Sequence, residues 1–374
     1  MVRGWVASPD GRHHGAHRDE AARDLGASSA GFLDLSANIN PLGPPEAVLA
    51  AASRALHEDT ERYPDLQYPE LRAALAGYLG VSPEVVLPTN GGAEALFLAA
   101  RVAAEGYVRN VRKKAVILEP TFSEYAAAAH AAGFEVVRVV VRRAASDFRL
   151  DLAALDEALA NRRDVGLVFL CNPNNPTGDA TPREEVLSLA EWVRGAGAAL
   201  VVDEAFADFV PPLSVAGMVG RDLFVARSFT KFFAMPGLRL GCLVARDLER
   251  VRAFQPSWSV NAVAAAAGMA AARDEVYAKA TIAEVKMRRR ELFSALGGLP
   301  GITPYPSAAN FLLVHGPERL PEELAKRGVL VRGCEPFRGL GPGYLRVAVR
   351  SKEENERFVG VLRSFLGSPL GGAS

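Results

Sequence analysis

The chain has 374 residues, 49% of them hydrophobic and 23% charged, and its 43 basic and 43 acidic side chains leave a formal net charge of zero. That balance excludes a global field that would attract nucleic acid or an acidic membrane surface, so a small-molecule partner is favoured. The sequence contains no apolar run of membrane-spanning length and no apolar signal segment near residue 1, which predicts a soluble protein without a recognisable export signal. Three cysteines that lie far apart favour a reducing cytoplasm as its setting.

Residues 1–45 form a polar N-terminal arm, and residues 46–255 alternate helical patterns with short apolar strands. The predicted strands are Val85–Leu87, Ala115–Glu119, Val136–Val141, Gly166–Cys171, Ala199–Asp203, Leu223–Arg227 and Gly241–Val244. Because these runs are almost continuously apolar, helices should cover both faces of the sheet, as in a mostly parallel doubly wound fold. Such a sheet binds its ligand at the carboxyl ends of its strands.

Residues 256–374 have the pattern of a smaller α+β domain, which the arm is expected to join. An Ala-rich helical stretch over about 260–296 leads into predicted strands at Phe311–Val314, Val329–Arg332 and Leu345–Val349. Helices are expected near 320–327 and 353–366, and the tail after Leu366 should fray. The cleft between the two domains is the expected substrate site.

The three cysteines, Cys171, Cys242 and Cys334, lie far apart in the sequence. They show neither the pairing of a disulfide framework nor the short spacing of a metal site. We therefore interpret them as packing residues and expect no bound metal.

Two segments place reactive groups near strand ends. Asp203 ends an apolar strand, where an isolated aspartate is more often a turn former. Lys231 lies in Ser228-Phe229-Thr230-Lys231, with Arg239 eight residues later. Apolar surroundings lower the pKa of a lysine and free its amine to attack an aldehyde, and the hydroxyls and the arginine could hold a phosphate. Alone, Lys231 could be a surface residue, but the full spacing indicates a cofactor site.

Two further segments supply turns. Asn172-Pro173-Asn174-Asn175-Pro176-Thr177-Gly178 is a turn that can also present amide side chains to a ligand. Thr89-Asn90-Gly91-Gly92-Ala93-Glu94 predicts a glycine loop before the helical run Ala95–Val102, and the N–H groups at such a helix start suit a phosphate.

In this order the segments resemble the class I and II, fold-type I aminotransferases over about residues 14–366. The resemblance implies a pyridoxal 5′-phosphate (PLP) enzyme whose large domain carries a mostly parallel seven-stranded sheet. It makes Lys231 the Schiff-base lysine and Asp203 the partner of the pyridinium nitrogen, which keeps the ring an electron sink. It further implies that Asn175 bonds the phenolic oxygen and that Phe122 stacks on the ring. The implied phosphate cup is formed by Gly91, Gly92, Ala93, Ser228, Thr230 and Arg239.

The resemblance also implies a homodimer, because Tyr63 resembles the tyrosine that reaches the partner subunit's cofactor phosphate. Arg346 resembles the arginine that clamps a substrate carboxylate, a task suited to a bidentate guanidinium. Candidates for the rest of the substrate grip are Arg332, Asn38, Asn175, His14 and, less favoured, Arg350. Arg332 and Arg350 could instead be strand-end surface charges, and His14 could belong to an unstructured terminus.

Within the family, the chain looks most similar to the threonine-phosphate decarboxylases, near relatives of histidinol-phosphate aminotransferases. The matching stretches are His14-Gly15, Leu33–Gly43, Asp203–Phe209, Trp258–Asn261 and Arg346–Ser351. Many relatives have Tyr where this chain has Phe206, and the Phe206 variant together with Trp258-Ser259-Val260-Asn261 is shared with the decarboxylases.

The resemblance implies decarboxylation of O-phospho-L-threonine to (R)-1-amino-2-propanol O-phosphate in cobalamin biosynthesis. The alternative is histidinol-phosphate aminotransferase or a related class II aminotransferase that uses 2-oxoglutarate and glutamate. Which reaction occurs depends on whether the carboxylate or the Cα–H bond stands perpendicular to the ring. A PLP-sensing regulator without turnover is a remote third reading, since it would need an added DNA-binding domain and a basic patch.

Overall fold

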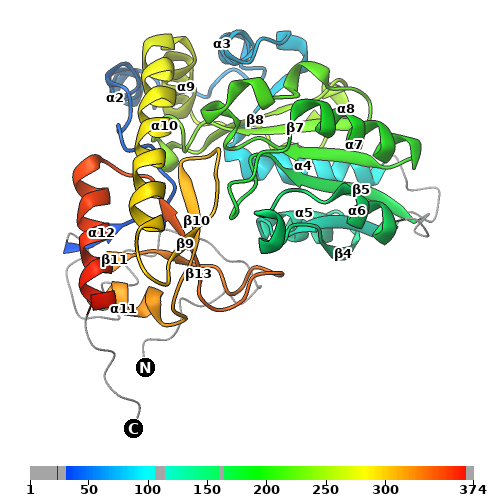
Figure 1. The fold of residues 1–374 in the computed structure, drawn as a ribbon. Coiled ribbons are helices and arrows are strands. Elements are labelled where there is room, and N and C mark those ends of the chain that lie inside the picture. Colours follow the sequence, from blue (N-terminus) through cyan, green and yellow to red (C-terminus); the bar gives the residue numbers. More distant parts are fainter. Residues whose placement is uncertain (1–22, 24–30, 106–113, 160–163, 368–374) are drawn as a thin grey trace.

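A seven-stranded sheet forms the centre of the larger part of the molecule (Figure 1). The computed structural model describes residue 23 and residues 31–105, 114–159 and 164–367. Across the sheet the strand order is β2 (Val86–Asn90), β8 (Leu240–Val244), β7 (Leu223–Ser228), β6 (Ala199–Asp203), β5 (Val165–Cys171), β3 (Lys114–Glu119) and β4 (Glu135–Val140). Strand β8 runs antiparallel to both of its neighbours, and the other neighbouring pairs are parallel. The predicted α/β fold with a mostly parallel sheet is confirmed.

Helices pack on both faces of this sheet. One face is covered by α4 (Gly91–Glu105), α5 (Glu124–Ala131) and α8 (Leu248–Arg252). The other is covered by α3 (Pro69–Leu79), α6 (Leu152–Leu159), α7 (Arg183–Gly195) and α9 (Ala262–Arg273), with α2 (Glu46–Glu58) packed on α9. All residues of β5, β6, β7 and β8 are buried, whereas the edge strand β4 is partly exposed. Burial on both faces explains why the inner strands have continuous apolar runs.

A second, antiparallel sheet forms the smaller part of the molecule. Its order is β12 (Arg332–Gly333), β13 (Tyr344–Ala348), β10 (Phe311–His315) and β9 (Thr303–Pro304). Helices α10 (Glu275–Gly297), α11 (Leu320–Lys326) and α12 (Lys352–Gly367) share its apolar core. Strand β1 (Leu33–Asp34) pairs in parallel with β11 (Val329–Leu330), so the end of the arm lies beside this sheet (Figure 1).

Three local predictions were wrong. The helical stretch over 260–296 is interrupted at Asp274, which leaves helical geometry and caps α10 by accepting a hydrogen bond from the Tyr277 N–H at 2.9 Å. The strand predicted over Val329–Arg332 is divided between two sheets, because β11 pairs with the arm and β12 with β13. The glycine loop is also absent: β2 ends at Asn90 and α4 begins at Gly91.

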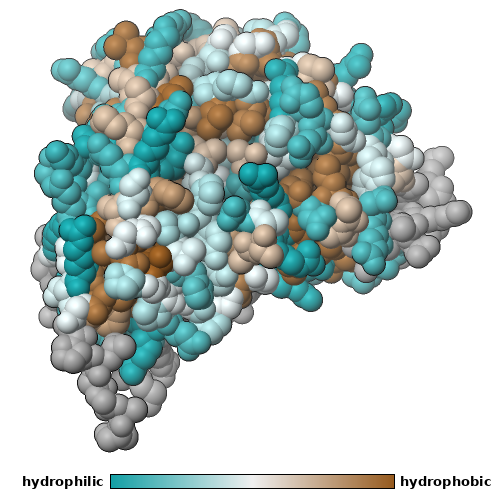
Figure 2. All heavy atoms as spheres, viewed as in Figure 1, coloured by the Kyte–Doolittle hydropathy of each residue, from teal (hydrophilic) through white to brown (hydrophobic). Residues whose placement is uncertain are grey.

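The outer surface mixes hydrophilic and apolar side chains. Figure 2 shows separate brown patches among teal residues on the face that carries α10. Among the described residues, no helix combines the length and hydropathy needed to cross a membrane.

Candidate active site

A cavity of about 500 Å³ lies where the carboxyl ends of β5, β6 and β7 meet residues from the smaller sheet. Strand register brings Cys171 beside Asp203 and Asp203 beside Ala226. Twelve of the residues predicted from the sequence line this cavity: Asn38, Gly92, Ala93, Phe122, Asn175, Asp203, Ser228, Thr230, Lys231, Arg239, Arg332 and Arg346. Its volume is within the range of small-molecule sites, and it lies at the ligand-binding edge of a parallel sheet.

Lys231 lies just beyond the end of β7. Its Nζ donates to the Ser228 Oγ at 3.3 Å and stands 5.5 Å from the centroid of the Phe206 ring. Burial lowers the pKa of Lys231, and the cations Arg239 and Arg346 lower it further, while Asp203 opposes them. A lowered pKa increases the fraction of neutral amine, which is the nucleophilic form.

Asp203 is buried at the end of β6 and accepts two hydrogen bonds. The Tyr125 hydroxyl donates to Oδ2 at 2.8 Å, and the Ala205 N–H donates to Oδ1 at 2.9 Å. Burial raises the pKa of Asp203, whereas the nearby Lys231 cation and both donors favour its ionised form. Tyr125 is itself held in place by stacking on Phe169, with ring centroids 5.2 Å apart. The carboxylate is therefore oriented and prepared to face a cation in the cavity.

The first two residues of α4, Gly91 and Gly92, form a cradle, because glycine has no side chain to fill the space beside Arg239 and Ser228. A Cβ added to Gly91 would lie 2.6 Å from Nη2 of Arg239, and one added to Gly92 would lie 3.2 Å from Cβ of Ser228. Gly91 also has φ +75°, which favours glycine. The Ser228 and Thr230 hydroxyls lie 2.8 Å apart beside this cradle. Hydroxyls, a guanidinium and a helix start converge there, a combination that suits a phosphate.

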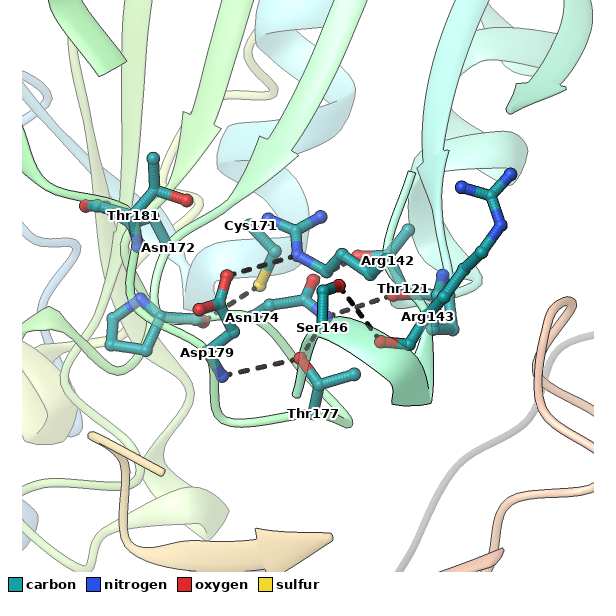
Figure 3. Close-up of polar contacts among 12 residues, drawn as sticks. Thr121, Arg142, Arg143, Ser146, Cys171, Asn172, Asn174, Thr177, Asp179 and Thr181 are labelled. Carbon is teal, nitrogen blue, oxygen red and sulfur yellow. Dashed lines mark hydrogen bonds and ion pairs between the residues drawn. The ribbon is translucent and has the colours of Figure 1, made fainter. Parts of the chain in front are cut away.

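The turn after β5 is braced by its own side chains (Figure 3). Asn172 and the Thr181 backbone exchange two hydrogen bonds of 2.9 Å, and the Asn174 amide donates to Thr177 Oγ1 at 2.8 Å. Behind the turn, the buried Arg142 donates from Nε to Asp179 at 3.4 Å. The segment was predicted both to form a turn and to present amide side chains to a ligand. Asn172 and Asn174 stabilise the turn, while Asn175 lines the cavity.

Two buried arginines form the opposite wall of the cavity. Arg332 and Arg346 lie directly opposite each other on β12 and β13, and only 4% and 6% of their surfaces are exposed. Arg346 donates to the Asn175 Oδ1 and to the Ser36 carbonyl, and its guanidinium lies 5.4 Å from the Phe311 ring centroid. Within the part of the chain that the structure describes, Nη2 of Arg332 and Nε of Arg346 have no hydrogen-bond partner, and no carboxylate forms an ion pair with either residue. Two buried positive charges without a counter-ion indicate an anionic ligand.

Three candidates, Gly91, Tyr63 and Arg350, do not line the cavity, whereas Asn38 does, and its buried Oδ1 has no hydrogen-bond partner among the described residues. Gly91 directly precedes the cavity-lining Gly92, and a Cβ added to it would meet Arg239. Tyr63 is 80% exposed and does not line this chain's cavity. Arg350 is also outside the lining, and its guanidinium pairs with Glu354 at 3.1 Å. His14 falls outside the described residues.

Sequence reasoning missed Tyr125 and a buried ion-pair network. Tyr125 lies in Pro-Thr-Phe-Ser-Glu-Tyr, three residues after Phe122, and that helical spacing could have indicated a second inward-facing ring. Arg227 pairs with both Glu204 and Asp208, and these three residues are not among those that line the cavity. This network fixes the segment that follows Asp203, and no local sequence pattern indicated it. The three cysteines are buried and free, and Cys171 lines the cavity.

Comparisons with known proteins agree with this geometry. The family model for aminotransferase class I and II matches residues 30–362. A threonine-phosphate decarboxylase of Salmonella typhimurium is 39% identical over 362 residues, covering 94% of this chain and 96% of the relative. A histidinol-phosphate aminotransferase of Methanopyrus kandleri is 32% identical over 394 residues, covering 98% and 96%. The crystal structure of a histidinol-phosphate aminotransferase from Clostridium acetobutylicum superposes with a TM-score of 0.81 at 27% identity, covering 90% of this chain and 100% of that one.

Proposed function

The chain belongs to the aminotransferase class I and II family, whose members are PLP-dependent enzymes, and we propose that it removes CO2 from O-phospho-L-threonine. The product is (R)-1-amino-2-propanol O-phosphate, and we place the reaction in cobalamin biosynthesis in the cytoplasm. The proposed assembly is a homodimer in which Tyr63 of each chain reaches the cofactor phosphate of its partner.

The residues around the cavity fit PLP. The cradle at Gly91 and Gly92 leaves the space that a phosphate needs, since a Cβ at either position would crowd Arg239 or Ser228. Lys231 supplies an amine of lowered pKa to the aldehyde, and Asp203 supplies a buried carboxylate to the pyridinium nitrogen. Asn175 and Phe122 line the same cavity and are proposed to contact the phenolic oxygen and the ring face. When bound, the protonated PLP ring accepts the electrons that a bond to the substrate's Cα leaves behind.

The arginine pair carries the substrate assignment. O-phospho-L-threonine has a carboxylate and a phosphate dianion, which match two guanidiniums that have no counter-ion among the described residues. We assign Arg346 to the carboxylate and Arg332 to the phosphate, assisted by Asn38 and, in the arm, His14. With both ends held, the Cα–carboxylate bond can be fixed perpendicular to the cofactor ring. After that bond breaks and CO2 leaves, the Lys231 ammonium returns a proton to Cα.

Phe206 supports decarboxylation over transamination. Its ring lies beside Lys231 and packs edge-on against Phe311, with centroids 5.0 Å apart. A phenylalanine offers no hydroxyl to the phenolic oxygen at a position where many aminotransferases have tyrosine. The 39% identity to a threonine-phosphate decarboxylase over 94% of the chain supports the same choice.

Histidinol-phosphate aminotransferase is the second candidate, favoured by a relative that is 32% identical over 98% of the chain. The arginine pair could hold the histidinol phosphate and the glutamate carboxylates in turn. This candidate makes a different prediction for the amino group, which would be transferred to 2-oxoglutarate instead of being retained in the product.

A product assay separates the two candidates. The PLP-loaded enzyme is incubated with O-phospho-L-threonine, and separately with histidinol phosphate and 2-oxoglutarate, while CO2 and glutamate are measured. We expect CO2 from the first mixture and no glutamate from the second. Glutamate without CO2 would replace the decarboxylase by the aminotransferase and leave the cofactor site unchanged.

Replacing Tyr125 with phenylalanine is expected to weaken PLP binding about tenfold. The change removes the hydroxyl that donates to Asp203 at 2.8 Å and keeps the stacked ring. Without this donor, which lowers the pKa of Asp203, burial is less opposed and the pKa rises, so the carboxylate pairs less well with the pyridinium. A hydrogen bond to a charged group contributes about 1.5 kcal/mol or more. The PLP dissociation constant, measured by absorbance titration of apoenzyme, checks this. Tyr78→Phe, which removes a hydroxyl from Asp208 outside the cavity lining, is the matched control.

A further inference from the structure

We propose that Trp258 is a positioning residue that holds Tyr63 ready to enter the cofactor site of a second copy of this chain. The inference rests on the homodimer of the proposed function. It gives a role to Trp258-Ser259-Val260-Asn261, a segment that does not line the cavity.

Trp258 and Tyr63 form an aromatic pair at the surface. Their ring centroids lie 4.5 Å apart at an interplanar angle of 30°, and 43% of Trp258 and 80% of Tyr63 are exposed. The indole Nε1–H also donates to the Pro64 carbonyl at 3.1 Å. Trp258 therefore contacts both the side chain of Tyr63 and the backbone next to it. Tyr63 lies in an irregular segment between α2 and α3, where no strand or helix fixes it.

The backbone at Trp258 is held in an unfavourable conformation. Its φ is +56°, in the left-handed region that a bulky side chain rarely adopts. Neighbouring contacts enforce it: the Tyr68 hydroxyl accepts from the Val260 N–H at 3.2 Å and donates to the Val260 carbonyl at 2.8 Å, and Asn261 caps α9. Strain that the surroundings enforce is typical of a residue whose orientation serves a function.

The same segment is joined to the glycine cradle of its own chain. Ser259 Oγ donates to Glu94 Oε1 at 2.7 Å, and Glu94 Oε2 accepts from the Asn90 N–H at 2.6 Å. Asn90 directly precedes Gly91. Hydrogen bonds therefore connect the segment that carries Trp258 to the start of α4, where this chain's own cofactor phosphate is proposed to bind.

Preorganisation is the physical advantage of this arrangement. An exposed tyrosine on an irregular segment would lose rotamer freedom when it binds a phosphate, and stacking on Trp258 removes much of that freedom beforehand. The gain expected from fixing one such side chain is about three- to tenfold in affinity.

A double-mutant cycle on PLP affinity tests the inference. We expect Tyr63→Phe to raise the PLP dissociation constant about tenfold and Trp258→Leu to raise it about three- to tenfold. Because both changes act through the Tyr63 hydroxyl, adding Trp258→Leu to Tyr63→Phe should change the constant less than about twofold. Trp258→Phe keeps a ring and should lose less than Trp258→Leu. Trp192→Leu, an exposed tryptophan on α7, is the matched control and should change nothing.

Mixed dimers show in which site Trp258 acts. In a dimer of one Trp258→Leu chain and one Lys231→Ala chain, the single intact lysine site receives Tyr63 from a chain with Trp258. We expect that site to bind PLP covalently with wild-type affinity. When both changes are on one chain paired with wild type, the single lysine site should bind weakly.

The outcomes distinguish the role of Tyr63 in the partner's site from the positioning role of Trp258. Normal PLP affinity in Tyr63→Phe would overturn the role of Tyr63 and this inference together. A loss in Tyr63→Phe without one in Trp258→Leu, or losses that multiply in the double variant, would overturn the positioning role alone. Neither result alters the CO2 assay, which tests the decarboxylase by itself.

Discussion

Replacing Lys231 with alanine is expected to lower the rate of CO2 release from O-phospho-L-threonine by at least about 10³-fold. The change removes both the amine that holds PLP covalently and the group that returns a proton to Cα, and proton transfer alone contributes about 10²- to 10⁴-fold. Among the described residues, the Lys231 side chain makes one hydrogen bond, to Ser228, so the fold should persist. Single-turnover CO2 release measures the loss of activity, and far-ultraviolet circular dichroism checks that the fold persists.

Lys231→Arg serves as the control that keeps a positive charge without a nucleophilic amine. It should bind PLP reversibly, and borohydride should fail to fix the cofactor to the chain. The pH dependence gives a second readout. Because burial lowers the pKa of Lys231 below its usual 10.5, covalent capture of PLP by wild-type apoenzyme should increase with pH and level off below that value. Covalently bound PLP and turnover in Lys231→Ala would show that another lysine carries the cofactor.

Arg332→Met is expected to reduce kcat/KM for O-phospho-L-threonine by about two orders of magnitude and, at the same time, to stabilise the free protein. The loss follows because truncating a buried partner of a charged group costs about 2–5 kcal/mol. The stabilisation follows because Arg332 is only 4% exposed, and its guanidinium has no described counter-ion and no described hydrogen-bond partner at Nη2. The unliganded fold therefore contains an uncompensated buried charge. Methionine has a similar length and can pack against Phe337, so the gain should be about 1–3 kcal/mol.

Kinetics with two substrates identify which group Arg332 holds. L-threonine lacks the phosphate, so its slow turnover should be the same in wild type and Arg332→Met. Thermal unfolding of the cofactor-free proteins measures the stability change. Arg327→Met replaces an exposed arginine that pairs with Glu323 on α11, and its kcat/KM should remain unchanged. Equal losses for both substrates would move Arg332 from the phosphate to the carboxylate, and a lower melting temperature would show that its charge is compensated in the free protein.

Much of the central sheet could be predicted because its information is local. The strand at Ala199–Asp203 has the predicted limits, and the other six differ by only a few residues at their ends. Inner strands covered on both faces need continuous apolar runs, and such runs stand out in a single sequence. The helix break at Asp274 was missed because a single capping residue within an Ala-rich stretch is a weak signal compared with the helical propensity around it.

The site was predicted where its residues follow strand ends. Asp203 is the last residue of one predicted strand, Asn175 lies in the turn after another, and Lys231 follows the next strand along the chain. The topology of a parallel sheet brings such residues together. Tyr125 could not be assigned in this way. Its contact with Asp203 joins residues 78 positions apart, and only the packing of α5 against the sheet brings them within hydrogen-bond distance.

The sequence by itself determined the fold class, the family resemblance and the lysine, aspartate and asparagine of the cavity, because each depends on residue type next to a local pattern. The tertiary structure alone decided that Arg332 faces Arg346, that neither has a described counter-ion, and that Trp258 stacks on Tyr63. These facts depend on strand pairing and on contacts between residues as many as 195 positions apart. The free energy of such contacts comes from burial and geometry in the folded chain, which no short stretch of sequence encodes.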